Sequence, residues 1–510
     1  MELPPTVTIC VLCTLLAAIY AAFKPRRGPL PPGPRGYPII GNTLQMPREH
    51  AWVTFAQWAK DYGPIIHLSV LGSPLFVLNS PDVISELLEK RSAIYSDRPV
   101  IPMAGELIGF SEYMTLNRYG DRLRESRKLM LGALSPRSAP ALNAIEEVKA
   151  LELLPRLLHA PAQFRAHLRW LVASVVYQVT HGYRVESCED PLVQSAERLN
   201  DLFGRLLEPG AFLVDSFPFL RHIPDWFPGA GFKAVAKRER EALIKARDEP
   251  YDMVREQVIR GTATPSFVAD LVERNSNPTP EEDNLYRSVA TVFYLGGSDT
   301  SVSALESFFL IMLLYPEVQR KAQAELDCVL EPGQLPKFSD RSRLRYLSAL
   351  LLEVHRWNPV VPISIPHCVT EDNVFQGYLI PKGSSVIANT WAILHNPDLY
   401  PDPFEVVPER YLKQDSPAKS EKINPDPRAF VFGYGRRACP GQMLAEDTLF
   451  IAAATILAMF DIAKALGPDG APIEPKVQYD GGIICHPSPF DCRITPRSKE
   501  AERFMRNIAV

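Results

Sequence analysis

Short apolar runs bounded by turn residues predict strands near the start of the globular part of the chain. Residues 65–70 and 75–79 are apolar runs on either side of a Leu-Gly-Ser-Pro turn, which favours two adjacent strands. Residues 81–91 begin with a proline and predict a helix, because proline is well tolerated in the first helical turn. Strand patterns return over residues 372–389 and 477–493.

A helical period of apolar positions dominates from residue 121 onward. The predicted helices cover residues 143–159, 165–181, 191–207, 235–260, 283–314, 341–357 and 442–460. Two of them stop before Pro316 and Pro359, since the residue before a proline avoids the helical conformation. The pattern contains no internal repeat. It predicts a mainly α fold with a small β-rich part, arranged as one large unit.

An uncharged apolar run precedes the globular part. Residues 6–23 would span ~27 Å as a helix, which matches the core of a bilayer. Lys24, Arg26 and Arg27 follow the run directly, so the positive-inside rule leaves the rest of the chain in the cytosol. A cleaved signal peptide is the alternative, but its basic residues would precede the run. We expect an uncleaved, single-pass membrane anchor over residues 1–28.

Two further segments lack a helical or strand pattern. Residues 29–41 are dense in proline, which keeps a chain extended, so they form a stiff spacer between the anchor and a domain at 42–510. Residues 206–232 combine aromatic residues with prolines. Two interpretations of that segment stay open: a loop packed on the core, or a loop in the membrane interface with Trp226 at headgroup level.

Composition narrows the class of function. Hydrophobic residues make up 46% and charged residues 22% of the 510 positions, as in ordinary globular proteins. The 55 Lys and Arg nearly balance the 59 Asp and Glu, which argues against a nucleic-acid binder, because such proteins need a strongly basic face. Eight cysteines are too few for a disulfide scaffold. Cys10 and Cys13 lie inside the apolar run, where a metal or redox role is not expected.

Residues 429–442 form a glycine-rich segment around one cysteine. Gly433, Gly435 and Gly441 allow tight turns close to a flat group. Cys439 comes just before the last predicted helix, and a helix N-terminus favours a thiolate. A lone thiolate suits a haem iron better than zinc, which needs three or four ligands. The alternative is a buried cysteine in a turn.

This segment resembles the haem-binding signature of the cytochrome P-450 superfamily, Phe-x-x-Gly-x-Arg-x-Cys-x-Gly. The residues that match its fixed positions are Phe432, Gly435, Arg437, Cys439 and Gly441. The resemblance implies the cytochrome P-450 fold and a haem b cofactor (iron-protoporphyrin IX). It also implies that Cys439 is the axial ligand of the iron, that Arg437 pairs with a haem propionate, and that Phe432 shields the sulfur.

A glycine pair interrupts the long apolar helix at residues 296–301, which read Gly-Gly-Ser-Asp-Thr-Ser. Each interior glycine costs a helix roughly 1 kcal/mol relative to alanine, so the pair needs a reason. A groove over the haem is one reason, and a notch for helix packing is the alternative. The segment resembles the family's oxygen-activation motif. That resemblance implies that Asp299 and Thr300 deliver protons during dioxygen activation.

Glu353 and Arg356 are three residues apart on one predicted helix, where their side chains can pair. They resemble the family's Glu-x-x-Arg motif, and Arg410, in a Pro-Glu-Arg-Tyr run, resembles its partner. The resemblance implies a buried ion network that orders the core behind the thiolate loop and has a structural rather than a catalytic role.

Arg127 and His367 resemble two further haem-propionate contacts of the family. Leu123 stands where the family usually has tryptophan, which removes one hydrogen bond to a propionate. Arg127 also belongs to a basic cluster, which is either part of a docking face for a reductase or a solvated helix face. The cluster comprises Arg122, Arg124, Arg127 and Lys128.

The resemblance implies a monooxygenase domain at 42–510, anchored in the endoplasmic reticulum and facing the cytosol. It would insert one atom of O₂ into a small lipophilic substrate. Electrons would come from NADPH through a separate NADPH–cytochrome reductase, because the chain has no Gly-rich nucleotide fingerprint. The residues around the haem loop look closest to fungal enzymes of secondary metabolism, and apolar pocket segments suggest a substrate such as a terpenoid. A haem-thiolate isomerase or dehydratase and a non-catalytic haem-binding protein are the alternatives.

Overall fold

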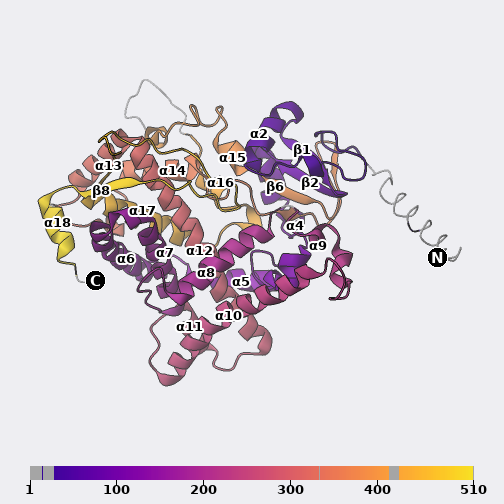
Figure 1. Ribbon diagram of the computed structural model, residues 1–510, viewed down its shortest axis with the longest axis horizontal. Coiled ribbons are helices and arrows are strands. Elements are labelled where there is room, and N and C mark those ends of the chain that lie inside the picture. The colour runs from indigo at the N-terminus through magenta and orange to yellow at the C-terminus, as the bar shows by residue number, and fades with distance from the viewer. Residues whose placement is uncertain (1–13, 15–27, 209, 332, 413–423, 509–510) are drawn as a thin grey trace. The chain divides into compact units, whose positions relative to one another are not determined.

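The computed structural model describes residues 14, 28–208, 210–331, 333–412 and 424–508 (Figure 1). The chain divides into two compact units. Unit 1 comprises residues 1–99 and 365–389, and unit 2 comprises residues 100–364 and 390–510. The membrane anchor expected over residues 1–28 lies outside the described residues except at Thr14 and Gly28. The domain boundaries drawn from the sequence therefore stay predictions.

A four-stranded sheet in the order β1-β2-β6-β3 organises unit 1. β1 (Ile65–Val70) pairs antiparallel with β2 (Ser73–Leu78), and the register places Ile65 opposite Leu78. β6 (Ser385–Ala388) runs parallel to β2, and β3 (His367–Cys368) runs antiparallel to β6. The two strands predicted around the Leu-Gly-Ser-Pro turn are therefore confirmed, with the second strand starting two residues earlier.

The remaining elements of unit 1 are short helices and one hairpin. The helix predicted over residues 81–91 is present as two consecutive segments, α3 and η2. The elements are η1 (Thr43–Gln45), α2 (Ala51–Tyr62), α3 (Pro81–Ile84), η2 (Ser85–Lys90), α4 (Ser92–Tyr95), β4 (Asn373–Phe375) and β5 (Tyr378–Ile380).

Unit 2 is mainly helical, in agreement with the apolar period of the sequence. Its longer helices are α5 (Asp121–Ala133), α6 (Ala139–His159), α7 (Phe164–His181), α8 (Pro191–Leu206), α10 (Gly231–Arg260), α11 (Phe267–Arg274), α12 (Pro280–Leu314), α13 (Pro316–Val329), α14 (Arg345–Trp357), α17 (Gln442–Met459) and α18 (Lys499–Arg506). Its short helices are η3 (Pro102–Ile108), η4 (Phe110–Glu112), η5 (Pro161–Gln163), α9 (Leu213–Ser216), η6 (Pro218–His222), η7 (Phe338–Asp340), α15 (Thr390–Leu394), η8 (Pro408–Tyr411), α16 (Arg428–Val431) and η9 (Gly435–Arg437).

The long helix α12 forms the core of unit 2 and packs against α7, α10 and α17 (Figure 1). It begins with a capping box: the Thr279 side chain accepts a hydrogen bond from Glu282 N, and the Glu282 carboxylate accepts one from Thr279 N. It ends at Leu314, before Pro316. Nearly every side chain from Ser301 to Leu313 is buried, so hydrophobic burial stabilises this half of the helix.

Two described helices, α12 and α17, are long and apolar enough to cross a membrane. Their most apolar windows are 72% and 67% buried inside the protein. Because these apolar surfaces are already covered by protein, both helices serve as core helices here. They carry no argument about a membrane span.

The strand prediction for residues 477–493 is wrong over most of its length. The segment holds one isolated bridge, between Tyr479 and Pro487, and a strand forms only at its end, where β8 (Cys492–Pro496) pairs with β7 (Phe460–Lys464). The reason lies in where the backbone groups bond. Cys485 N donates to Val360 O, so part of the segment is tied to another loop rather than to a neighbouring strand.

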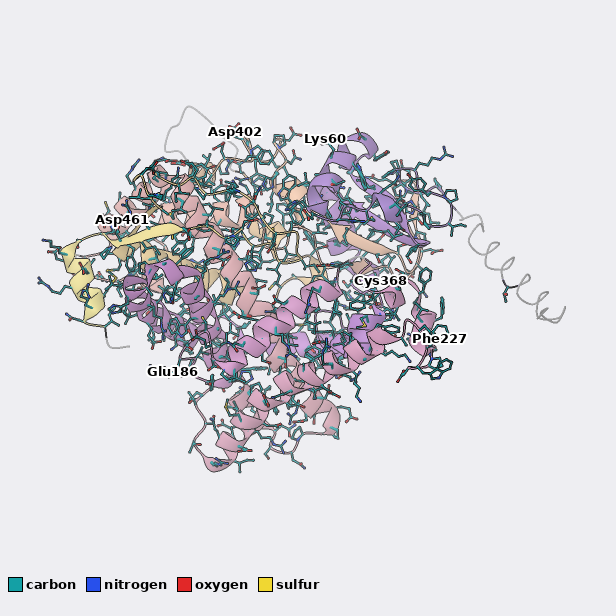
Figure 2. The ribbon with its side chains drawn as sticks, viewed as in Figure 1. Lys60, Glu186, Phe227, Cys368, Asp402 and Asp461 are labelled. Atoms are coloured by element: carbon teal, nitrogen blue, oxygen red, sulfur yellow. The ribbon has the colours of Figure 1, made fainter. Side chains whose placement is uncertain are left out.

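The aromatic segment over residues 206–232 folds into the short helices α9 and η6 with irregular connections. Trp226 is 80% exposed and Phe219 is 66% exposed, and Phe227, labelled in Figure 2, is about half exposed. Most of the surface of Trp226 and Phe219 is therefore not covered by the protein, which favours the interface interpretation for these two rings.

Candidate functional site

The loop around Cys439 connects α16 to α17 and closes on itself. Cys439 N donates a hydrogen bond of 2.7 Å to Phe432 O, which brings the two ends of the loop together. Gly433 and Gly435 have φ of 76° and 54°, a left-handed conformation that glycine adopts without strain. Gly441 has an ordinary φ of −91° and serves as the N-cap of α17, so the turn requires glycine at the first two positions only.

The Cys439 side chain faces an open space although protein surrounds it. Its surface is accessible, yet burial raises the pKa of the thiol, while the backbone N–H of Gly441 and the charge of Arg127 act in the opposite direction. The helix N-terminus therefore stabilises a thiolate as expected, but burial outweighs it. A thiol in this setting needs a bound cation to stay ionised, which fits a metal ion with one protein ligand.

Two arginines flank the cysteine loop. Arg127 Nη1 on α5 donates 2.7 Å to Ala438 O, next to Cys439. Arg437 donates to Met114 O and Asn117 O at 3.1 and 2.7 Å. Burial lowers the pKa of Arg127, and no ion pair joins Arg127 to an acidic residue within the described part of the chain. A half-buried cation of this kind beside the thiol fits a cofactor that carries carboxylates.

The helix α14 supports the Cys439 loop through a contact between two rings. The Phe432 ring meets the His355 ring of α14 edge to face, with centroids 5.4 Å apart. Burial lowers the pKa of His355 to about 4, so this ring is neutral at physiological pH. A cavity of about 610 Å³ lies against the same loop, and its wall includes Cys439, His355 and Arg341.

The three residues of the predicted ion network lie together. Glu353 and Arg356 are completely buried and form a two-point pair at 2.6 and 2.9 Å. Arg410 Nε lies 3.2 Å from Glu353 Oε1, and the Tyr411 hydroxyl donates to the same oxygen at 3.0 Å. Arg356 also donates to the carbonyls of Leu394, Pro403 and Glu405, which ties the irregular chain after α15 to α14.

The glycine pair of α12 opens a gap in an otherwise buried helix. Gly296 is exposed, and a Cβ built on it would meet no atom within 4 Å, whereas a Cβ on Gly297 would touch Val176 at 3.4 Å. Open space therefore lies against Gly296, as a groove requires, while Gly297 packs against α7. Thr300 Oγ1 donates to Gly296 O at 2.8 Å, which places the hydroxyl at this gap.

Asp299 takes part in a charged cluster that the sequence patterns did not identify. His486 Nε2 lies 3.2 Å from Asp299 Oδ1, and His486 Nδ1 lies 3.2 Å from Glu306 Oε2. One signal was present in the sequence: Asp299 and Glu306 are seven residues apart, on one face of an apolar helix. No pattern in the sequence paired His486 with Asp299 or Glu306, because it is far away along the chain.

Two further residues concern the expected propionate contacts. His367 lies in β3 of unit 1, where it is buried with Nδ1 2.7 Å from Tyr95 O, and its predicted haem contact stays a prediction. Leu123, on α5, is buried to 1% exposure. Its apolar side chain offers no hydrogen bond where the family usually has tryptophan.

The basic cluster on α5 is largely paired with nearby polar groups. Arg124 pairs with Asp121, and Lys128 lies 3.5 Å from Glu125. Arg122 lies 3.6 Å from Glu112 and donates to Asn284 at 2.6 Å. Both interpretations of the cluster, a docking face and a solvated helix face, are compatible with these exposed pairs.

Comparisons with known proteins agree with this geometry. A family model described as Cytochrome P450 matches residues 31–493. The chain is 44% identical over 493 residues to cytochrome P450 monooxygenase 208 of Postia placenta, which covers 96% of this chain and 95% of the relative. It is 41% identical to cytochrome P450 monooxygenase claR of Ampulloclitocybe clavipes, over 99% of this chain and 93% of the relative.

Two further matches extend the comparison. The tryptamine 4-monooxygenase of Psilocybe cyanescens is 38% identical, over 97% of this chain and 98% of the relative. A solved structure of a zebra fish cytochrome P450 with abiraterone matches with a TM-score of 0.69 at 24% identity, covering 88% of this chain and all of that chain. The latter match supports the mainly helical fold with small sheets.

The ion network yields a stability prediction. Replacing Glu353 by Gln keeps the shape of the side chain but leaves the Arg356 guanidinium buried without its counter-charge. We expect a loss of ~3–5 kcal/mol in the free energy of unfolding, measured by urea titration of the purified full-length protein.

The matched control is Glu256→Gln, which removes an exposed partner of Arg260. A change of less than about 1 kcal/mol is expected there, because exposed ion pairs contribute little. Equal effects of the two substitutions would contradict the structural role assigned to Glu353.

Proposed function

We propose that this chain, which belongs to the cytochrome P450 family and is a monooxygenase, oxidises a small lipophilic substrate in fungal secondary metabolism. Electrons come from NADPH through a separate NADPH–cytochrome reductase. The observation that carries the proposal is the closed Cys439 loop, which presents one thiol to an open space beside two arginines.

Groups of this loop and its surroundings would hold the haem. Cys439 would ligate the iron, and Arg127, Arg437 and His367 would pair with the propionates. Phe432, whose carbonyl accepts from the Cys439 amide and whose ring meets the His355 ring, would shield the sulfur from water. When bound, the haem supplies the activation of dioxygen and the transfer of one oxygen atom to the substrate.

Proton delivery is assigned to Asp299 and Thr300 on α12. The Gly296 gap gives dioxygen room beside the helix, and the Thr300 hydroxyl lies at that gap. Thr300 can hold a proton donor in place by exchanging its bond to Gly296 O for a bond to a reacting group. Asp299, one residue earlier, supplies protons through water.

The substrate pocket is proposed from apolar residues of unit 2. Met103, Phe110 and Phe293 are almost completely buried, at 0%, 2% and 3% exposure. The full proposed lining comprises Ile101, Met103, Leu107, Phe110, Phe293, Val360, Val361, Ile363, Ile483 and Ile484. Such a lining suits a lipophilic substrate, for example a terpenoid. The related tryptamine 4-monooxygenase makes an aromatic amine the second class to test.

Membrane attachment is proposed to involve two segments. The apolar run at residues 6–23 spans the endoplasmic reticulum membrane once and leaves the catalytic part in the cytosol. The exposed rings of Phe219, Trp226 and Phe227 form a second contact in the headgroup region. The basic cluster on α5 contributes to docking of the reductase.

The first prediction concerns the iron ligand. In Cys439→Ala, the absorption band that reduced thiolate haem shows with carbon monoxide is lost, because no thiolate reaches the iron. The control Cys328→Ala removes an exposed cysteine and keeps the band. A retained band in Cys439→Ala would assign the ligand to another residue.

The second prediction concerns proton delivery. In Thr300→Ala, NADPH is still consumed, but organic product falls by about 10²-fold and hydrogen peroxide release rises. The reason is that the Thr300 hydroxyl no longer directs proton delivery. The control Thr180→Ala removes a buried threonine on α7 that makes the same kind of bond, to Val176 O at 2.7 Å. Unchanged product per NADPH in Thr300→Ala would refute the assignment.

The third prediction concerns the anchor. Deleting residues 1–28 moves the protein from the membrane fraction to the soluble fraction in high salt, or leaves it bound only weakly through the aromatic segment. Adding Trp226→Ser to the deletion then releases the remainder, measured by sedimentation with vesicles. Full membrane retention after both changes would contradict the proposed attachment.

A further inference from the structure

A chain of four alternating charges crosses unit 2 beside the proposed proton-delivery residues. The Arg165 guanidinium on α7 donates two hydrogen bonds, of 2.9 and 2.8 Å, to the Glu306 carboxylate on α12. The Glu306 carboxylate meets His486 Nδ1 at 3.2 Å, and His486 Nε2 meets Asp299 at 3.2 Å. Glu306 is completely buried, so the chain runs from the core toward the Asp299 carboxylate.

The position of His486 is fixed by the loop that carries it. His486 N donates to Asp480 Oδ1 at 2.9 Å. The residue before His486, Cys485, accepts a bond of 2.7 Å from Ser303 Oγ of α12. The residue after it, Pro487, accepts a bond of 2.9 Å from the Arg165 guanidinium. Because both neighbours are tethered to helices, the imidazole is aimed at α12 by the fold.

The geometry requires a protonated imidazole. A neutral imidazole has one N–H and one lone pair, so one of its nitrogens would direct a lone pair at a carboxylate. Only the imidazolium donates to both Asp299 and Glu306. Burial by itself would lower the pKa of His486, but the bonds to these two carboxylates outweigh burial and raise it to about 9.

The remaining charges around the cluster act in both directions, because carboxylates favour a cationic His486 and arginines oppose it. Burial would raise the pKa of Glu306, but the hydrogen bonds from His486 and Arg165 lower it to about 2. Arg169 on α7 interacts with both Asp299 and Glu306 and pairs with Glu197 of α8 at 3.4 Å. Asp480, on the loop of His486, accepts its bond from the backbone N–H of His486 and not from the ring. The carboxylates of Asp299 and Glu306 favour the cationic imidazole and prevail over the arginines of α7, which oppose it.

We propose that His486 is a positioning residue for proton delivery, whose imidazolium holds the Asp299 carboxylate in one orientation next to Thr300. The inference rests on the proposed role of Asp299 and Thr300. A lone carboxylate on a helix rotates among several side-chain conformations, and the tether restricts it to one. Without the tether, Asp299 organises water near the gap less well, and reducing equivalents leave as hydrogen peroxide.

The pH dependence follows from the sign of the shift. The pKa of His486 in the folded protein is higher than the ordinary value of about 6.5. The tether is therefore complete below about pH 6.5 and is lost as the pH rises through about 9. Hydrogen peroxide released per NADPH is expected to rise over the same alkaline range.

The first test is independent of turnover. In full-length protein with isotope-labelled histidine, the imidazole resonance that disappears in His486→Gln is followed by NMR as the pH changes. Its midpoint is expected near pH 9, and in Asp299→Asn it is expected to fall by at least one pH unit. A midpoint near pH 6.5, or one that Asp299→Asn leaves unmoved, would overturn the proposal.

The second test measures hydrogen peroxide per NADPH in the reconstituted enzyme. His486→Gln is expected to raise this ratio several-fold at pH 7 and to abolish its alkaline rise, while the exposed control His159→Gln behaves like the parent protein. An unchanged ratio in His486→Gln overturns the inference alone when Thr300→Ala and Asp299→Asn still raise it. If those two variants also leave the ratio unchanged, the proposed proton-delivery function fails instead. Should His486→Gln not fold, the parent protein and Asp299→Asn still decide, because the absence of any histidine resonance with a midpoint near pH 9, or such a midpoint that Asp299→Asn leaves unmoved, would overturn the proposal.

Discussion

The buried pair between Glu353 and Arg356 is the interaction on which the Cys439 side of unit 2 depends. Both side chains have no exposure, so each charge and each N–H must find its partner inside the protein. Arg356 satisfies this need by bonding Glu353, the backbone carbonyl of Leu394 at the end of α15, and two carbonyls of the irregular chain that follows. The pair thereby orders a segment that has few regular hydrogen bonds of its own. On the next residue of α14, His355 supports Phe432, whose carbonyl closes the Cys439 loop.

The helix α12 has a buried half that packs in the core and a middle segment that carries the proposed proton-delivery residues. Its C-terminal half is an almost completely buried apolar helix, which gives unit 2 its core. Its middle gives up burial at Gly296, where open space lies against the backbone. The polar residues that follow are not left to solvent: Thr300 bonds its own helix, and Asp299 meets His486. A rigid helix can therefore present a gap and a fixed carboxylate without losing its packing.

Local patterns predicted the parts of the structure that depend on neighbouring residues. The helices α12 and α14 end just before prolines, and Phe432, Arg437 and Cys439 lie close together because they share one loop. Contacts between residues that are far apart along the chain could not be predicted in this way. β7 forms by pairing with β8, which is distant in the sequence. In the segment before β8, Cys485 N donates to Val360 O of another loop and not to a neighbouring strand. His486 is 180 positions from Glu306, and no periodicity reveals such a contact.

The central claim is that this chain is a monooxygenase that works at Cys439. The most direct measurement is isotope labelling: the full-length protein, with reductase and NADPH, is incubated with fungal extract fractions under ¹⁸O₂. We expect products that carry one ¹⁸O atom each, with the second atom recovered in water. Products without ¹⁸O, or with oxygen taken from water, would contradict the claim and favour an isomerase or a dehydratase.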